Sequence, residues 1–417
     1  MILNLYSSFA TSDSTPISLQ QAIERALEFQ PIVKKGREKV FELHYKAEET
    51  WLDFLPHISV EGRHIYFKDE NLFDVGLRLR YPLFEGGRVY YGYNKNKHQK
   101  QAAEVNVAIL EQDLIKNVKV AYVNLLLQGW LLKTRHNLRK RLLALHALTL
   151  DLIKNGTASP SQSLRVKAQL LQSEADITEH DKYVDIAKSV LLHLLNQEQT
   201  DRITPVERVR HFIPSHYTLE QVLNAALDRA EFEHYEHQKL SLEHAINEAE
   251  SAYWPRLNVD AVYGLSNYPM GHRMIDAPAV GDFEPLWGVG LSIELDFFSW
   301  AKARKKSQVA SSHLKQLRLE EEQFQNDLSF QVKKAYIAWR AAKTHVKIAQ
   351  ELYATSAQSY QEILEEYKNG VETLESVLET LQMLVRSRAD YLSAFYGVYM
   401  TEAYLEREIG WHNYESP

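Results

Sequence analysis

Apolar side chains occupy every second position in short stretches of the chain, and polar side chains or glycines stand between them. A period of two is typical of a β-strand with one apolar face. We therefore predict strands at residues 72–82 and 286–296, each preceded by a partner strand, at residues 57–67 and 256–265. Each strand is about 10 residues long, the length that a tilted strand needs to cross a lipid bilayer.

After each pair of strands the apolar residues recur every three or four positions, which is the period of an α-helix. The clearest run extends from Leu328 to Tyr367, and neither Gly nor Pro occurs at residues 300–369. As one helix, a segment of about 70 residues would be about 100 Å long. The pattern predicts two long α-helical hairpins, at residues 88–195 and 300–411.

Each predicted hairpin turns at a Lys-Asn-Gly triplet. The residues are Lys154, Asn155 and Gly156 in the first hairpin and Lys368, Asn369 and Gly370 in the second. Glycine readily takes the left-handed conformation that ends many helices. We therefore place the hairpin tips at residues 154–161 and 367–372.

The chain consists of two copies of one unit, because matching segments recur in the same order. The segment Val75-Gly76-Leu77, for example, returns as Val289-Gly290-Leu291. Each copy opens with a capping box, Ser18 with Gln21 and Thr218 with Gln221. A helix of about ten turns is then predicted to run to a proline, Pro56 or Pro255, which cannot continue it.

The repeats divide the chain into successive segments. We predict an N-terminal extension at residues 1–16, a first repeat at 17–196, a linker at 197–216, a second repeat at 217–411 and a tail at 412–417. Residues 1–10 hold no Lys or Arg, and Ser8-Phe9-Ala10 has the small-x-small form of a signal cleavage site. We expect a mature chain that begins near Thr11.

Composition excludes several classes of function. The 417 residues contain no Cys, so disulfides, thiol catalysis and Cys-ligated metals are absent, and the net charge of −7 gives no basic surface for nucleic acid. No stretch of about 18 residues is free of charged or strongly polar side chains, so no transmembrane helix is predicted. No phosphate-binding loop, catalytic triad or metalloprotease motif is present. We expect no enzymatic activity and no cofactor.

Four amphipathic strands from one chain cannot close a barrel, and an open sheet edge is not tolerated in lipid. Strands that face lipid would therefore require an oligomer, and three chains would supply twelve strands. The alternative is a coiled-coil scaffold or membrane-remodelling helical protein without a channel, which leaves the repeated strands without a role. A third alternative, a metal-binding periplasmic protein, rests on His234, His237 and His244.

Several segments resemble one known family. The junction from Tyr81 through Gly86-Gly87 to Arg88 resembles the strand-to-helix junction of TolC-like outer-membrane efflux proteins. Residues 367–378, with residues 387–399 downstream, are similar to that family's second hairpin. The resemblance covers about residues 17–411, and the ordered set of motifs is more specific than any one of them.

The resemblance implies a mainly α protein with a membrane β-barrel part, built from two tandem repeats that each hold a short helix, two strands and a long helical hairpin. Three chains would form a 12-stranded barrel continuous with a periplasmic α-helical barrel. Such a homotrimer spans outer-membrane lipid and serves as the exit duct for a periplasmic adaptor protein and an inner-membrane pump. The adaptor would dock at the two Lys-Asn-Gly tips.

The resemblance also implies site residues. Acidic residues beyond the second tip form rings in the family's pore, and the matching positions here are Ser376 and Glu379, with Glu372 and Glu375 nearby. Three converging carboxylates would favour cations. An ordinary solvated helix face is the alternative interpretation.

Three further residues match the family's tip gate. They are Tyr367 on the second hairpin and Ser161 and Gln162 on the first. Because Gln162 is uncharged, we do not expect a salt bridge at that position.

Overall fold

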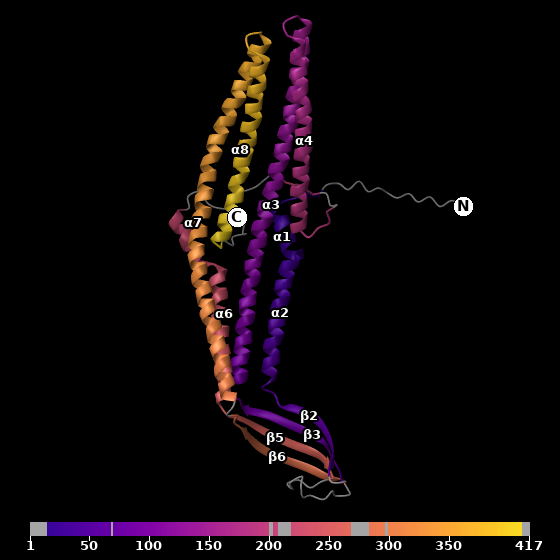
Figure 1. Ribbon diagram of the computed structural model, residues 1–417, viewed down its shortest axis with the longest axis vertical. Coiled ribbons are helices and arrows are strands. Elements are labelled where there is room, and N and C mark those ends of the chain that lie inside the picture. The colour runs from indigo at the N-terminus through magenta and orange to yellow at the C-terminus, as the bar shows by residue number, and fades with distance from the viewer. Residues whose placement is uncertain are drawn as a thin grey trace, which may run out of the picture. The chain divides into compact units, whose positions relative to one another are not determined.

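The computed structural model describes residues 15–67, 70–199, 203–206, 218–267, 283–296 and 299–410 (Figure 1). The predicted tail, most of the predicted N-terminal extension and most of the predicted linker lie outside these residues, so those predictions stay untested. The same holds for most of the turn-rich segment between the last two strands.

The described residues confirm a mostly helical fold with a tandem repeat. The first repeat contains β1 (Thr15–Ile17), α1 (Leu19–Phe29), α2 (Pro31–Leu52), β2 (His57–Phe67), β3 (Glu70–Phe84), α3 (Arg88–Lys154) and α4 (Pro160–Leu194). The second contains β4 (Ile203–Pro205), α5 (Leu219–Ala225), a 3₁₀ turn (Ala226–Asp228), α6 (Ala230–Glu250), a 3₁₀ turn (Ser251–Tyr253), β5 (Arg256–Ser266), β6 (Glu284–Glu294), α7 (Ser299–Lys368) and α8 (Leu374–Glu408).

The helix before the strands is interrupted in both repeats, so the prediction of one helix of about ten turns was wrong. In the first repeat the break is at Gln30, whose ψ is 126° and which precedes Pro31. Proline has no backbone N–H and disfavours helical geometry in the residue before it. In the second repeat the break is at Arg229, with φ −68° and ψ 143°.

Each break brings a side chain to the end of a long helix. The Gln30 amide donates to the carbonyl oxygens of His193 and Leu194 at the end of α4, both at 2.7 Å. The Arg229 guanidinium donates to the carboxylate and the carbonyl of Glu408, at 3.0 and 3.3 Å, at the end of α8. Carbonyls at a helix end lack partners within the helix, so both contacts satisfy exposed acceptors.

The four long strands form one antiparallel sheet in the order β2-β3-β5-β6. The β3–β5 pair joins the two repeats, with Leu79 opposite Ala261 and Gly76 opposite Gly264. A Cβ on Gly264 would lie 2.2 Å from the carbonyl oxygen of Val75, so only glycine fits where these backbones approach.

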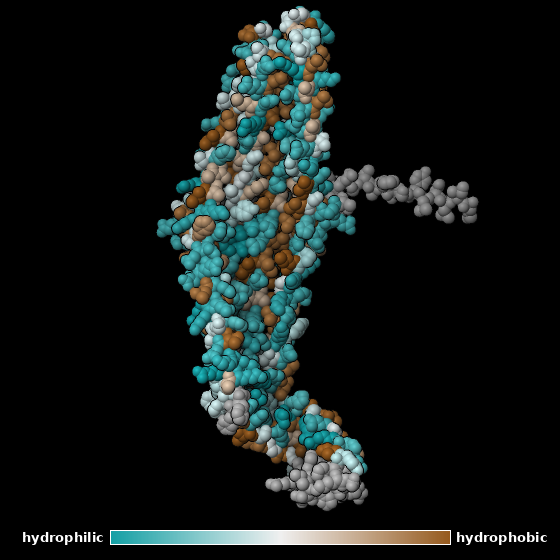
Figure 2. Space-filling view, viewed as in Figure 1, coloured by the Kyte–Doolittle hydropathy of each residue, from teal (hydrophilic) through white to brown (hydrophobic). Residues whose placement is uncertain are grey.

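The hairpin helices share an apolar core near their tips. Its fully buried members include Val166 of α4, Val377 of α8 and Leu381 of α8, with Tyr360 and Tyr367 of α7 nearly as buried. On the surface, hydrophobic side chains gather along the seam between the two hairpins (Figure 2). Side chains at spacings of three and four thus bury one stripe of each helix, as the sequence period predicts.

The chain divides into two compact units, and each draws on both repeats. One comprises residues 1–35, 108–229 and 325–417; the other comprises residues 36–107 and 230–324. The first holds the hairpin tips and the small parallel β1–β4 pair, and the second holds the four-stranded sheet and the helical segments next to it. Across the described residues, no helix is long and apolar enough to cross a membrane.

Candidate functional site

The two hairpin tips end in the same way. Gly156 and Gly370 have φ of 77° and 75°, and the residue after each donates its N–H back into the last turn, from Thr157 to Leu152 at 3.0 Å and from Val371 to Glu366 at 2.9 Å. These bonds satisfy helix-end carbonyls. The predicted triplets are therefore true helix ends.

The lysines of the triplets pair locally and stay exposed. Lys154 contacts Asp151 at 3.2 Å and Lys368 contacts Glu365 at 2.6 Å, each within its own helix end. Asn155 and Asn369 are also exposed. The tips therefore present polar groups whose charges are largely balanced.

A hydrogen bond joins the two hairpins where the gate was predicted. The Tyr367 hydroxyl on α7 donates to Oε1 of Gln162 on α4 at 3.3 Å. Ser161 does not take part in this contact: its hydroxyl bonds to Ser159, and its N–H is capped by the same side chain at 3.2 Å. The structure thus brings together two of the three predicted gate residues.

A salt bridge that the sequence analysis did not predict lies beside this bond. Arg165, one helical turn beyond Gln162, pairs with Glu375 of α8, and both side chains are exposed. The i, i+3 spacing of Gln162 and Arg165, which sets both on one helix face, was the available sequence signal. Glu375 is therefore neutralised by a partner on the other hairpin.

The other predicted pore residues lie at the start of α8: Glu372 just before its N-cap Thr373, and Ser376 and Glu379 in its first two turns. Glu372 accepts from the N–H of Thr373 at 3.2 Å, and the Ser376 hydroxyl lies 3.0 Å from that of Thr373. Glu379 is exposed and makes no hydrogen bond or ion pair with any described residue. Among the predicted acids Glu372, Glu375 and Glu379, it is therefore Glu379 whose charge is least compensated by a neighbour.

The four-stranded sheet has one largely apolar face, and that face is exposed. The register sets Val60 of β2, Leu77 of β3, Tyr263 of β5 and Trp287 of β6 in one row across the sheet. Trp287 and the neighbouring Val289 are 72% and 73% exposed. Exposed apolar surface of this extent marks a face that contacts lipid or another protein.

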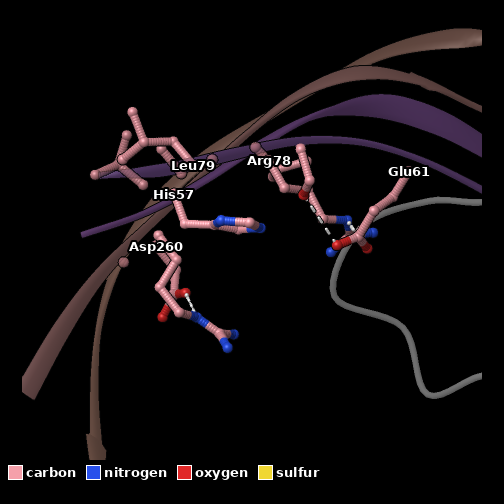
Figure 3. Close-up of a pocket in the computed structure, with 12 residues that line it drawn as sticks. His57, Glu61, Arg78, Leu79 and Asp260 are labelled. Atoms are coloured by element: carbon pink, nitrogen blue, oxygen red, sulfur yellow. Dashed lines mark hydrogen bonds and ion pairs between the residues drawn. The ribbon is translucent and has the colours of Figure 1, made fainter. Parts of the chain in front are cut away.

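The opposite face of the sheet carries paired charges (Figure 3). Arg78 contacts Glu61 at 2.9 Å and Asp74 at 3.0 Å, and Arg80 contacts Asp260 at 2.8 Å. An open cavity of about 390 Å³ lies on this face, and His57 lines it together with Arg78, Arg80 and Asp260. This face is suited to water and the other to an apolar medium.

A buried ion pair fixes α8 to α3 away from the tips. The side chain of Lys119 is 2% exposed, and its Nζ lies 2.5 Å from Oε2 of Glu406. One turn earlier on α8, Glu402 accepts a hydrogen bond from Trp339 Nε1 of α7 at 3.2 Å. Burial lowers the pKa of Lys119 and raises that of Glu406. The corresponding lysine of the second repeat, Lys333, is exposed.

The histidines of the metal alternative are separated. His234 Nδ1 lies 2.8 Å from the carbonyl oxygen of Ala102, whereas His237 and His244 stack on either side of His98 at centroid distances of 5.7 and 5.5 Å. Among the residues that the structure places, no cluster of three or more His, Asp or Glu has metal-site geometry.

The chain was compared with known families and structures. A family model described as outer membrane efflux protein matches residues 22–197 and 222–410. No curated protein sequence matches significantly. Among solved structures, the outer membrane protein VceC from Vibrio cholerae has 14% identity and a TM-score of 0.79, covering 94% of this chain and 96% of its own.

Two further structures share the fold. The CmeC outer membrane channel of Campylobacter jejuni has 15% identity and a TM-score of 0.78, covering 94% of this chain and 85% of its own. The open state of the MtrE outer membrane channel of Neisseria gonorrhoeae has 18% identity and a TM-score of 0.74, with 94% and 88% covered.

The family model spans both repeats, and the structural likeness extends over nearly the whole chain. The chain therefore belongs to the outer membrane efflux protein family, which places it in the bacterial outer membrane as a transport channel and not as an enzyme.

Proposed function

We propose that three copies of the chain form a channel that serves as the exit duct of a multi-component efflux or type I secretion system. Twelve strands would form the membrane barrel and the long helices a periplasmic tunnel. An adaptor protein and an inner-membrane pump would deliver the substrate. The tips with Lys154, Asn155 and Gly156 and with Lys368, Asn369 and Gly370 would dock to the adaptor.

The four-stranded sheet is the observation that carries this proposal. One face is exposed and apolar, the other holds ion pairs, and β2 and β6 form its two edges within the chain. An open edge in lipid leaves backbone groups unpaired, at a cost of several kcal/mol for each group. Pairing β6 of one copy with β2 of the next removes both edges by closing a ring.

The contacts between the hairpins support a tip that closes. The bond from Tyr367 to Gln162 and the ion pair of Arg165 with Glu375 hold the two hairpins of one copy together at their ends. Ser161 lies in the first turn of α4, next to this contact, and would border the gate. The ion pair of Arg165 with Glu375 is exposed, so breaking it is inexpensive. The hydrogen bond from Tyr367 to Gln162 is partly buried. Such a latch suits a duct that opens when a partner binds.

Glu379 would form the acidic ring at the narrow end, with Glu372 and Ser376 beside it. Glu375 would contribute less, since Arg165 neutralises it. Replacing Glu379 with Gln should reduce the preference of the reconstituted channel for K⁺ over Cl⁻, and Glu379→Asp should retain it. Equal selectivity in the parent protein and both variants would show that Glu379 does not line the pore.

The proposal as a whole is tested by membrane fractionation and native mass. The full chain should be found in the outer membrane, require detergent for extraction and have the mass of three chains. It should also produce conducting events in planar bilayers. A detergent-independent dimer would support the scaffold alternative and contradict the duct.

A further inference from the structure

The junctions between the sheet and its helices carry exposed aromatic side chains. They are Trp51 before β2, Tyr90 after β3, Trp254 before β5 and Trp300 after β6, and each is at least 38% exposed. Trp and Tyr gather where a membrane protein passes from lipid to water. On β6 the exposed apolar row continues to Leu295, just before α7 begins at Ser299. In a membrane barrel these junctions would lie at the membrane surface.

A groove with a basic rim, here called the basic groove, lies between α6 and α7 on the helix side of these junctions. Its floor is made by Leu242, Ala245, Val309 and Ala310, and its rim by Lys302, Lys305, Lys306 and His313. With a rise of 1.5 Å per residue, Lys302 and Lys306 lie about 5 and about 10 Å along α7 from its first residue. The headgroup layer of a bilayer is about 5–8 Å deep, and a lysine side chain can extend toward it. The rim is therefore within reach of lipid headgroups.

The positive charge of the rim is not balanced locally. The sequence between Asp296 and Glu320 holds Lys and Arg at six positions and no acidic residue, in a chain whose net charge is −7. Lys305 donates to the side-chain oxygen of Gln308 at 3.1 Å. Lys302 and Lys306 are exposed and form no hydrogen bond or ion pair with any residue that the structure describes. An anionic partner would complement this charge.

The contacts of α6 show which side of the helix layer the basic groove occupies. On α6, His237 and His244 face α3, where they stack on His98. Phe232 and Lys239 of α6 face α7, where they contact Phe324 and Glu321. At about 100° per residue, these two contact lines divide the surface of α6 into an arc of about 140° and an arc of about 220°.

The two arcs differ in character. The shorter arc contains three exposed acids, Glu233, Glu236 and Glu243. The longer arc contains Leu242 and Ala245, which form part of the groove floor. A layer of helices curves toward the side with the shorter arc, so the acids lie on the concave side and the basic groove opens on the convex side.

The neighbouring helix gives the same direction. On α3, His98 faces α6, and Asn96 faces α2, where its amide donates to Thr50 at 2.8 Å. The longer arc between these contacts contains Tyr90, one of the exposed aromatic residues at the junctions. In a closed barrel the convex side faces outward, so the aromatic residue and the basic groove would both meet the membrane surface and not the lumen.

From this placement we propose that the basic groove binds anionic phospholipid headgroups on the periplasmic surface of the outer membrane. Lys302 and Lys306 would pair with the phosphate groups, and the apolar floor would support the lysine stems. The inference rests on the proposed closed barrel and adds a lipid class to it. Three copies of the groove would form a basic collar that fixes the depth of the duct in the membrane.

The test titrates phosphatidylglycerol into the purified full-length protein in detergent and measures bound lipid by native mass spectrometry. The parent protein should bind phosphatidylglycerol more tightly than zwitterionic phosphatidylcholine. The double variant Lys302→Glu, Lys306→Glu should weaken phosphatidylglycerol binding at least about tenfold, because two attractive charges become repulsive. Lys302→Gln, Lys306→Gln should weaken it by a smaller factor, because the charges are only removed.

The matched control is Arg304→Glu, Lys315→Glu, which makes the same charge change at exposed positions on the opposite side of α7. It should leave binding within about twofold. Equal weakening by the control would reduce the effect to net charge and overturn the proposal. Equal binding of the two lipids by the parent protein would overturn it as well.

Inorganic phosphate separates a lipid site from a general anion site. It should not displace phosphatidylglycerol, since the acyl chains hold the lipid in the detergent belt beside the groove. Displacement by phosphate would assign the groove to small anions and overturn the proposal.

Oligomeric mass and conductance are recorded on the same proteins. If the glutamate variant remains a conducting trimer and binds phosphatidylglycerol like the parent protein, the groove proposal fails and the duct stands. If the parent protein neither assembles as a trimer nor conducts, the duct fails, and with it the outward placement of the groove.

Discussion

Gly156 and Gly370 end the longest helices of the chain through backbone conformation alone. Both have positive φ, and no atom lies within 4 Å of a Cβ added at either position. Neither glycine is there to make room for a neighbour. What each requires is the left-handed conformation, which costs other residues about 1–2 kcal/mol.

Replacing either tip glycine with alanine should therefore lower the free energy of unfolding by about 1 kcal/mol and with it the thermal unfolding midpoint. The matched control is Gly129→Ala, inside α3, where the added Cβ also meets nothing. That change should raise the midpoint slightly, because alanine favours helix by about 1 kcal/mol over glycine. Circular dichroism of the three variants in detergent measures the difference; equal midpoints would contradict it.

His98 makes the stability of the second unit depend on pH. Burial, followed by the neighbouring imidazoles and Lys97, lowers the pKa of His98. The unfolded chain then binds more protons than the folded one between that lowered value and about 6.5. Stability is fully present above about pH 6.5 and falls as the pH decreases through this window.

The unfolding midpoint should therefore decrease between pH 7.5 and pH 5, and His98→Gln should flatten that decrease. His136→Gln, at an exposed position of the same helix, is the control and should leave the slope unchanged. Calorimetry at several pH values makes the comparison. A parent slope that His98→Gln does not change would exclude the stacked histidines as its cause.

Strands β5 and β6 show how a period of two separates two environments. Val289 lies in the apolar row and its neighbour Gly290 in the polar row, opposite Asp260. A Cβ at Gly290 meets nothing within 4 Å. Adjacent positions thus offer a matched pair of substitutions.

Val289→Lys should block assembly into the outer membrane, since a lysine on a lipid-facing strand costs about 2–4 kcal/mol near the bilayer centre. Gly290→Lys adds the same charge to the polar face and should assemble normally. The heat-resistant oligomer in the outer-membrane fraction is the readout. Equal assembly of both variants would contradict a lipid-facing apolar row.

At the scale of elements, the contact between α4 and the second hairpin is the latch that we propose. Tyr367→Phe removes only the hydroxyl that donates to Gln162, and Arg165→Ala removes the partner of Glu375. The double variant should increase single-channel conductance, because both polar contacts between the tips are lost. Lys154→Ala, whose ion pair stays within α3, is the control. An unchanged conductance in the double variant would argue against a closed tip.

In the proposed trimer, the two edges of the sheet join the copies. The chain has no Cys, so every introduced thiol can be followed without background. Val60→Cys on β2 combined with Val289→Cys on β6 should be linked between copies by a flexible bis-maleimide. The ladder of products should end at three chains.

The matched control pairs Val60→Cys with Leu77→Cys, which lie opposite each other within one chain. That variant should be linked internally and migrate as a monomer. An open-ended ladder from the edge variant would indicate a fibre and not a closed ring.

The periodicity of the sequence determined most of the fold, because burial requires side chains to repeat with the geometry of the backbone. Period two located the strands, and period three to four located the hairpins. The strand pairing across the repeats and the breaks at Gln30 and Arg229 did not follow from it. The strand pairing and the break at Arg229 involve segments distant in the chain, as when Arg229 reaches Glu408, whereas Pro31 accounts locally for the break at Gln30.

The candidate site, too, contains residues that were predicted from the sequence and contacts that only the structure revealed. Tyr367, Gln162 and the acids beyond the second tip were named in advance because they match positions of the family that the chain resembles. The pairing of Arg165 with Glu375 and the burial of Lys119 were not predicted, since the similar local sequence around Lys333 gives an exposed lysine. Sequence by itself determined which helices and strands form, because local periodicity encodes them. Only the tertiary structure decided which charges meet, because that depends on which helix faces lie side by side.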